Sequence, residues 1–293
     1  LYEDYRDLID NECPEILGVA TMPEHRAEIM IYAAEHGVKA IYAEKTMVAS
    51  MAQADDVVEA VERNGVVFNM GTGFRWHPGF DTIKKLIDSG DLGNLRDMVM
   101  FYSNGINQHG IHALDLAMYL NNDVPAVSVQ ATLIDPEDGP IDGVMVKDPD
   151  VRGIVEFENG VTAHLLVAAF GDEQSIYCES GYLGAFGQRQ HWILRRFMPG
   201  RGKGKGDLIP EQFPYFKEAS STLMIIDDLV QALDTGEPTR GGVRVARAGD
   251  ELTFAFVESH MIGGKRVSLP LEGNRLKLDR NPAPKDILLE PKK

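Results

Sequence analysis

The sequence has little of several features, and each shortage excludes a class of protein. Its only cysteines are Cys13 and Cys178, too few for a disulfide framework, so we expect a reducing, cytoplasmic location. No apolar run approaches the roughly 20 residues that span a bilayer. The formal net charge is −16, which disfavours nucleic acid and anionic membrane as partners. Neither a G-x-S-x-G stretch nor a cluster with metal-ligand spacing occurs, so no nucleophilic serine and no metal site is predicted.

The first third of the chain alternates apolar runs with helical patterns. The runs at 16–21, 38–43 and 66–70 are typical of buried parallel strands, and the stretches 24–36 and 48–64, each followed by glycine, are typical of helices. With short links between them, these elements predict a doubly wound parallel sheet with right-handed crossovers. Three strands make only half of such a domain, which we place in residues 1–94.

From residue 95 onward the pattern changes to successive strands. Strand-like runs occur at 95–103, 127–134, 151–157, 161–169 and 175–179, and the E-N-G turn at 158–160 predicts a hairpin. Helices are expected at 111–120, 220–233 and 245–262, with a closing strand at 265–271. Residues 95–293 are therefore predicted to form an α+β domain with a large open, mainly antiparallel sheet. The glycine-rich basic stretch 198–207 reads as a flexible loop, either a solvated surface loop or an anion contact or lid.

Two stretches carry the residues with the most chemistry. Residues 41–46 (IYAEKT) read as a buried strand that ends in Glu44 and Lys45, and residues 105–115 (GINQHGIHALD) read as the entry to a helix with His112 and Asp115. A Lys and a His that meet at the carboxyl ends of strands could handle the proton of a hydroxyl as it becomes a carbonyl. The alternatives are a strand-end ion pair and an ordinary helix histidine.

Several motifs, in this order, resemble those of the Gfo/Idh/MocA family of sugar dehydrogenases. They are residues 20–25 (ATMPEH), 44–46 (EKT), 74–78 (FRWHP), 90–93 (GDLG), 110–115 (GIHALD) and the tail 258–270. The resemblance covers nearly the whole chain. It implies an amino-terminal Rossmann domain that binds NAD or NADP, followed by an α/β domain whose open sheet often forms a dimer interface.

The same resemblance implies roles for individual residues. His112 would be the acid/base, and Lys45 would orient the substrate hydroxyl and stabilise negative charge on its oxygen. The third catalytic position, four residues before the histidine, is commonly Asp in the family and is Gln108 here. Asp115 would fix the helix or His112. The residues expected along the cofactor are Thr21, Pro23, His25, Glu44 and Arg75.

The sequence departs from the family pattern at three points. No G-x-G-x-x-G occurs, so we expect the chain to begin after the unit that cradles the pyrophosphate, and the choice between NAD and NADP stays open. Gln108 cannot take a proton or raise the basicity of a neighbour as a carboxylate does. Thr46 replaces the proline of E-K-P, which removes a rigid turn beside Lys45.

The function expected first is hydride transfer between a nicotinamide cofactor and a sugar, cyclitol or related polyol, by a homo-oligomer with a carbohydrate-like substrate. The alternatives are a cofactor-independent hydrolase or lyase acting on a glycoside or ester, and a non-catalytic member that uses the sheet as an interface.

Overall fold

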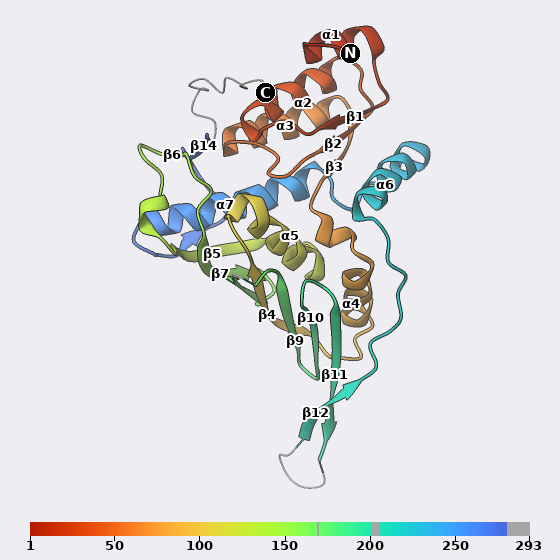
Figure 1. The fold of residues 1–293 in the computed structure, drawn as a ribbon, viewed down its shortest axis with the longest axis vertical. Coiled ribbons are helices and arrows are strands. Elements are labelled where there is room, and N and C mark those ends of the chain that lie inside the picture. Colours follow the sequence, from red (N-terminus) through yellow and green to blue (C-terminus); the bar gives the residue numbers. More distant parts are fainter. Residues whose placement is uncertain (169, 201–205, 280–293) are drawn as a thin grey trace, which may run out of the picture.

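A computed structural model describes residues 1–168, 170–200 and 206–279. The first layer is a three-stranded parallel sheet in the order β1-β2-β3, with α2 and α3 packed against each other beside it (Figure 1). Its elements are α1 (Tyr5–Glu12), β1 (Ile16–Val19), α2 (Pro23–Glu35), β2 (Ala40–Ala43), α3 (Met51–Arg63) and β3 (Val67–Met70). Ser50 caps α3 by accepting a hydrogen bond from the backbone N–H of Gln53.

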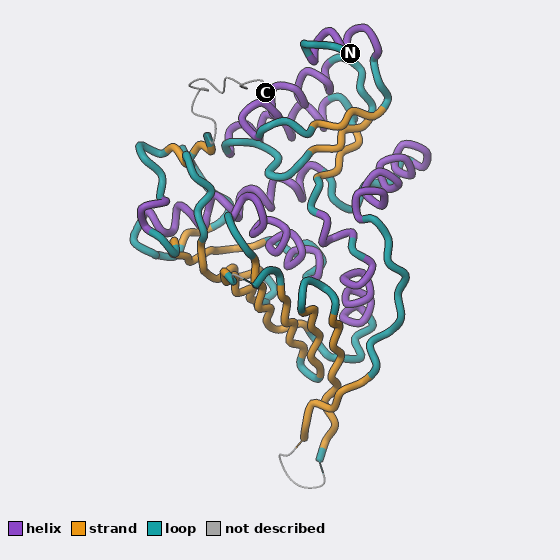
Figure 2. Tube along the Cα trace, viewed as in Figure 1, coloured by secondary structure: helices purple, strands orange, loops and turns teal. Residues whose placement is uncertain are grey.

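The second layer is a nine-stranded sheet in the order β12-β11-β10-β9-β4-β8-β7-β5-β13. Only the β4–β8 pair in it is parallel. Figure 2 shows the sheet running diagonally to a hairpin of β11 and β12 that extends away from the helices. Its strands are β4 (Leu95–Tyr102), β5 (Ala126–Leu133), β7 (Val151–Phe157), β8 (Thr162–Val167), β9 (Glu173–Cys178), β10 (Gly181–Phe186), β11 (His191–Pro199), β12 (Gly206–Glu211) and β13 (Val267–Ser268). β6 (Val144–Met145) and β14 (Lys277–Leu278) form a separate small pair.

Four helices connect and cover these layers: α4 (Pro78–Asp88), α5 (Ile111–Leu120), α6 (Ser221–Thr235) and α7 (Val243–Met261). α6 packs on β2 and β3, and α7 packs on both α3 and β5. Near its carboxyl end α7 is tied to the large sheet, because Ser259 Oγ accepts from the backbone N–H of Ala131 at 2.8 Å. Later parts of the chain thus complete the packing around the first sheet.

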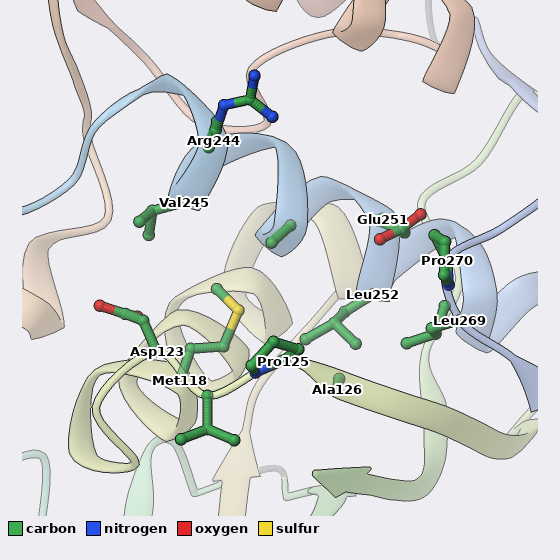
Figure 3. Close-up of a pocket in the computed structure, with 12 residues that line it drawn as sticks. Met118, Asp123, Pro125, Ala126, Arg244, Val245, Glu251, Leu252, Leu269 and Pro270 are labelled. Carbon is green, nitrogen blue, oxygen red and sulfur yellow. The ribbon is translucent and has the colours of Figure 1, made fainter. Parts of the chain in front are cut away.

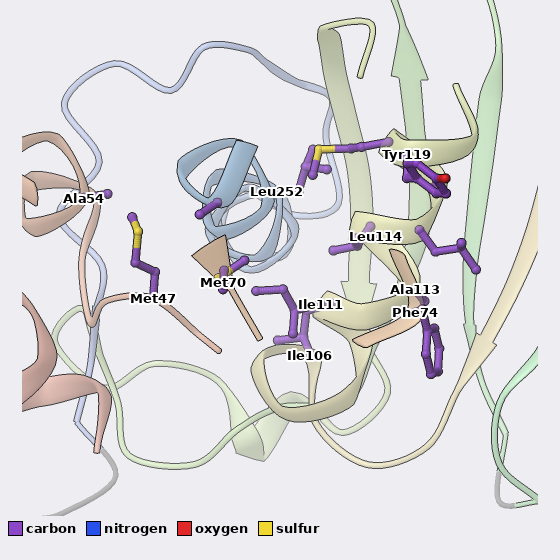
Figure 4. Close-up of a cluster of buried hydrophobic side chains, with 14 of the residues drawn as sticks. Met47, Ala54, Met70, Phe74, Ile106, Ile111, Ala113, Leu114, Tyr119 and Leu252 are labelled. Atoms are coloured by element: carbon purple, nitrogen blue, oxygen red, sulfur yellow. The ribbon is translucent and has the colours of Figure 1, made fainter. Parts of the chain in front are cut away.

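The core between the layers is apolar and continuous. Met70 at the end of β3, Met47 in the segment after β2, Leu252 of α7 and Ile111 of α5 belong to one cluster of buried side chains (Figure 4). All four are at most 2% exposed. Such a core fixes the edge of the small sheet against the start of α5, the two places where the sequence puts Lys45 and His112.

The predicted fold class is confirmed, with differences in detail. Strands β10 and β11 are not in the sequence prediction, and the closing strand covers two residues rather than 265–271. The predicted loop 198–207 is wrong at both ends, because residues 198–199 and 206–207 pair as strands. Residues 201–205 of that loop, and Ala169 at the end of another predicted strand, lie outside the described residues. The division between domains at 94/95 stays a prediction.

An aromatic cluster fixes α4 to the large sheet. The ring of Trp192, on β11, lies 5.2 Å from that of Phe80 and 5.4 Å from that of His77. Phe213 and Phe216, in the segment leading to α6, close over Trp192. The ring fits because Gly79 has no side chain: a Cβ there would come within 2.3 Å of it.

We therefore expect Gly79→Ala to lower the free energy of unfolding by about 1–3 kcal/mol through overpacking, measured by urea unfolding. The matched control is Gly18→Ala on β1, where a Cβ meets nothing within 4 Å. Equal stability of the two variants would contradict this packing.

Candidate functional site

The segment after β2 is joined directly to the turn before α5. Lys45 donates a hydrogen bond from Nζ to the backbone carbonyl of Gln108, and Thr46 Oγ1 donates to the carbonyl of Asn107 at 3.0 Å. Both acceptors belong to the π-helical turn Ile106–Gly110, a kind of turn that is frequent at functional sites. The structure thus brings Lys45 and Gln108 together although 63 positions separate them.

Two carboxylates from the loop before β7 hold this turn. Asp148 Oδ1 accepts from the backbone N–H and the side-chain amide of Asn107, both at 2.9 Å, and Asp150 accepts from the N–H of Gly105 at 2.6 Å. Gly105 has φ +78, and a Cβ there would lie 2.3 Å from the Asp148 carboxylate. Glycine is therefore required where the chain turns from β4 into the site.

His112 lies on the first turn of α5, in a mostly apolar setting. Its ring is 5.2 Å from that of Phe74, and its Nδ1 is buried without a hydrogen-bond partner in the described structure. Burial, with smaller contributions from the nearby Lys45, His109 and Arg189, lowers the pKa of His112 to about 3. The imidazole is therefore neutral at neutral pH, the state that can accept a proton.

This shift makes stability depend on pH in a defined direction. An unfolded histidine has a pKa of about 6.5, so between about pH 6.5 and 3 the unfolded chain binds this proton more strongly than the folded chain does. The contribution of neutral His112 to the free energy of unfolding is fully present above about pH 6.5 and is lost as pH falls from there toward 3. Between about pH 7.5 and 5, wild type should lose on the order of 1–2 kcal/mol more unfolding free energy than His112→Asn. Urea unfolding at both pH values measures this difference. Equal losses of unfolding free energy in wild type and His112→Asn would contradict a His112 that stays neutral in the folded protein.

Two buried charged side chains hold the backbone on either side of Lys45. Arg26 of α2 donates to the carbonyls of Thr21 at 2.8 Å and Glu44 at 2.9 Å, and also to that of Thr46. Asp250 of α7 accepts from the N–H groups of Met47 at 3.3 Å and Val48 at 3.1 Å. Because both are less than a tenth exposed, they fix the course of residues 44–48.

A further charged pair lies on the large-sheet side of His112. Asp172, just before β9, pairs with Arg189 of the β10–β11 turn at 3.4 Å, and the guanidinium carbon of Arg189 is 4.6 Å from the centre of the Phe74 ring. The sequence does not predict these two residues or Arg26 and Asp250, because they stand in no local motif and reach the site through long-range contacts.

The residues predicted to line a cofactor occupy two different places. Thr21 follows β1 and is exposed, and Glu44 accepts from the Tyr42 hydroxyl at 2.7 Å. Pro23 begins α2, with His25 in the same turn, and no side chain caps this helix. These four lie at the carboxyl edge of the small sheet beside Lys45.

Arg75 lies elsewhere, in the interior. Its exposure is 0%, and its guanidinium donates to Asp115 at 3.0 Å and to Asp123 at 2.7 and 2.9 Å. Asp115 is thus bound to Arg75, which agrees with a role in fixing α5. The cofactor-lining role of Arg75 stays a prediction.

A separate pocket of about 300 Å³ lies between the end of α5, α7 and the segment at Leu269–Pro270 (Figure 3). Met118, Val245 and Leu252 give it an apolar lining, and none of the predicted site residues borders it. Among the described residues, no three His, Cys, Asp or Glu side chains are grouped to hold a metal ion. No helix in the described ranges is both long enough and apolar enough to cross a membrane.

Comparison with known proteins places these features in context. Residues 1–72 match the family GFO_IDH_MocA, described as "Oxidoreductase family, NAD-binding Rossmann fold". Inositol 2-dehydrogenase of Salmonella paratyphi B is 31% identical over 93 residues, which are 31% of this chain and 27% of that protein. 2,7-Anhydro-N-acetylneuraminate hydratase of Mediterraneibacter gnavus is 29% identical over 140 residues, 42% of this chain and 37% of that protein.

Solved structures extend the match in fold. Levoglucosan dehydrogenase, in complex with NADH and L-sorbose, superimposes with a TM-score of 0.74 at 18% identity, covering 92% of this chain and 83% of that one. The family match over residues 1–72 confirms the predicted resemblance to the Gfo/Idh/MocA family, and the structural match confirms the fold. The matched segments cover 27% and 37% of the lengths of these two relatives. The matches do not test the expectation that this chain begins after the glycine-rich unit.

Proposed function

We propose that the protein is an NAD(P)-dependent oxidoreductase that interconverts a hydroxyl and a carbonyl on a sugar, cyclitol or related polyol. The observation that carries this proposal is the meeting of Lys45 and the π-helical turn beside a neutral, half-buried His112 at the carboxyl edge of a parallel sheet. Ligands of open α/β sheets bind outside this edge. The names of the relatives, inositol and levoglucosan dehydrogenases, support the substrate class.

The described residues fit the nicotinamide end of such a cofactor. Three parallel strands end at one edge, where the uncapped start of α2 offers backbone N–H groups and Thr21 offers an exposed hydroxyl. Thr21, Pro23, His25 and Glu44 would hold this part. When bound, the nicotinamide supplies the acceptor for the hydride that leaves the hydroxyl-bearing carbon.

The chain's own residues would manage the proton and the oxygen. Lys45 would donate a hydrogen bond to the hydroxyl oxygen and stabilise its negative charge as the C–H bond breaks. His112, being neutral, would accept the O–H proton, so that one carbonyl and one proton result from each hydride transferred. Gln108 would contribute its backbone carbonyl, which already positions Lys45. Its side chain has no carboxylate that could raise the basicity of His112.

The remaining parts of the proposal concern assembly and location. The large sheet exposes apolar side chains such as Val127, Ile154 and Tyr177, which supports a homo-oligomer formed through this sheet. The low cysteine content supports a cytoplasmic location.

The test is titration of the purified chain with NADH and NADPH, followed by nucleotide fluorescence, and then assays with myo-inositol, levoglucosan and D-apiose. Saturable binding and oxidation of at least one polyol are expected. Lys45→Ala should lower kcat about 10²- to 10³-fold with nucleotide affinity retained. Lys39→Ala is the matched control, since Lys39 pairs with Glu15 on the surface.

Two results would overturn the proposal. One is the absence of nucleotide binding at millimolar concentration, and the other is unchanged turnover in Lys45→Ala. Because one relative is a hydratase, the products are also analysed for water addition or loss. Such products without nucleotide reduction would favour the lyase alternative.

A further inference from the structure

We propose that Asp172 and Arg189 bind a second hydroxyl of the substrate, adjacent to the one that reacts, so that the site selects neutral polyols with neighbouring hydroxyls. This inference rests on the proposed function, because it takes His112 as the reacting end. It assigns a specificity role to two side chains that no motif marks.

The Asp172 carboxylate has one oxygen whose hydrogen-bonding capacity the described structure leaves unsatisfied. Asp172 Oδ1 is buried and has no hydrogen-bond partner in the described structure, while Oδ2 lies 3.4 Å from Nη1 of Arg189. The two side chains are only 17% and 26% exposed. A buried carboxylate oxygen without a donor is costly, and a ligand hydroxyl would supply the missing donor.

The Asp172–Arg189 pair lies close to Phe74, whose ring is also close to that of His112. Phe74 links the pair to the proposed acid/base: the guanidinium carbon of Arg189 is 4.6 Å from its ring centre, and the ring of His112 is 5.2 Å away. Burial raises the pKa of Asp172, and the nearby Arg189 and His109 only partly offset this rise. The same two residues lower the pKa of His112, so the four groups share one electrostatic neighbourhood.

The Asp172–Arg189 pair matches the hydrogen-bonding groups of hydroxyls. An ionised carboxylate only accepts hydrogen bonds and a guanidinium only donates them. One hydroxyl can donate to Asp172 Oδ1 while its own or its neighbour's oxygen accepts from Arg189, which is the donor–acceptor pattern of two adjacent hydroxyls. Because Asp172 already balances Arg189, the pair itself adds no net positive charge for a sugar acid or a sugar phosphate, and it fits the hydroxyls of a neutral polyol.

The experiment is isothermal titration calorimetry of myo-inositol, levoglucosan and D-apiose, together with the monodeoxy analogues of the first two. Wild type is compared with Asp172→Asn and Arg189→Gln, with NADH affinity measured on every sample. The control is Asp55→Asn, which removes the carboxylate of another Asp–Arg pair, with Arg247 at 2.7 Å, away from the site. Thermal unfolding checks that each variant is folded.

Wild type should bind at least one of the polyols, and Asp172→Asn should weaken that binding about 10- to 100-fold, as expected for a lost hydrogen bond to a charged group. Removing the adjacent hydroxyl from the polyol should weaken binding to wild type by a similar factor but should hardly change binding to Asp172→Asn. Asp55→Asn should bind the polyols as tightly as wild type does.

Equal affinities of wild type and both variants would overturn the assignment. So would tighter binding of D-glucuronate than of the neutral polyols, or binding of none of the polyols. If NADH still binds in that last case, only the hydroxyl subsite is refuted. If NADH fails to bind while the polyol pattern holds, the proposed function fails and the subsite stands.

Discussion

Oxidation of the best polyol substrate is expected to slow by about 10²- to 10⁴-fold in His112→Asn, the usual contribution of a positioned general base. Asparagine keeps a polar side chain of similar reach on α5 but cannot take the hydroxyl proton at neutral pH. NADH affinity should change little, because the four residues proposed to hold the nicotinamide lie at the end of the small sheet. Steady-state kinetics and nucleotide fluorescence measure the two quantities separately.

His36→Asn is the matched control for this result. His36 also stacks on an aromatic ring, with 3.7 Å between its ring centre and that of Tyr32, but it is exposed at the end of α2. Its variant should turn over like wild type. Equal rates for His112→Asn and His36→Asn would remove His112 from the reaction.

Replacing Arg75 by methionine is expected to lower the free energy of unfolding by about 3–5 kcal/mol. Arg75 is fully buried and bridges two carboxylates, of which Asp115 is itself 1% exposed. The substitution leaves the charge of Asp115 buried without its partner, which costs far more than the ion pair itself contributes. Urea unfolding of the two proteins measures the loss.

The double variant Arg75→Met, Asp115→Leu separates this cause from simple loss of packing. Removing both charges should restore a large part of the stability, because well-packed apolar pairs often replace buried ion pairs without loss. NADH affinity is measured on the same samples. Unchanged stability with weakened NADH binding in Arg75→Met would show instead that Arg75 contacts the cofactor, as the motif resemblance implies.

Local sequence patterns are sufficient to predict the elements that have a clear period. The strands β1 to β3, the amphipathic helices and the hairpin turn at residues 158–160 all follow from composition within a few residues, although β1 is less buried than its apolar run predicts, with only Val19 buried. Strands β10 and β11 are missed for a physical reason. Glycines interrupt β10 at Gly181 and Gly184, and the space beside Gly181 is filled by Leu92, a contact that no local window contains.

The residues of the site also fall into two groups, those that local motifs mark and those that only tertiary contacts bring to the site. Lys45 and His112 stand in short motifs at the ends of recognisable elements, so the sequence predicts both. Asp250 and Arg26 act on the backbone of residues 44–48 from α7 and α2, and Asp172 and Arg189 come from the far sheet. Their places depend on tertiary packing, which periodicity does not encode.

The double attachment of α7 limits how this fold can be recombined. The middle of the helix carries Asp250, which holds the backbone beside Lys45, and its carboxyl end carries Ser259, which is hydrogen-bonded to β5. α6 likewise covers β2 and β3 from a later part of the chain. In a chimera that takes only residues 1–94 from a relative, the Lys45 segment of one protein would therefore pack against α7 of the other. Exchange should preserve the geometry around Lys45 only when residues 221–261 are exchanged with that sheet.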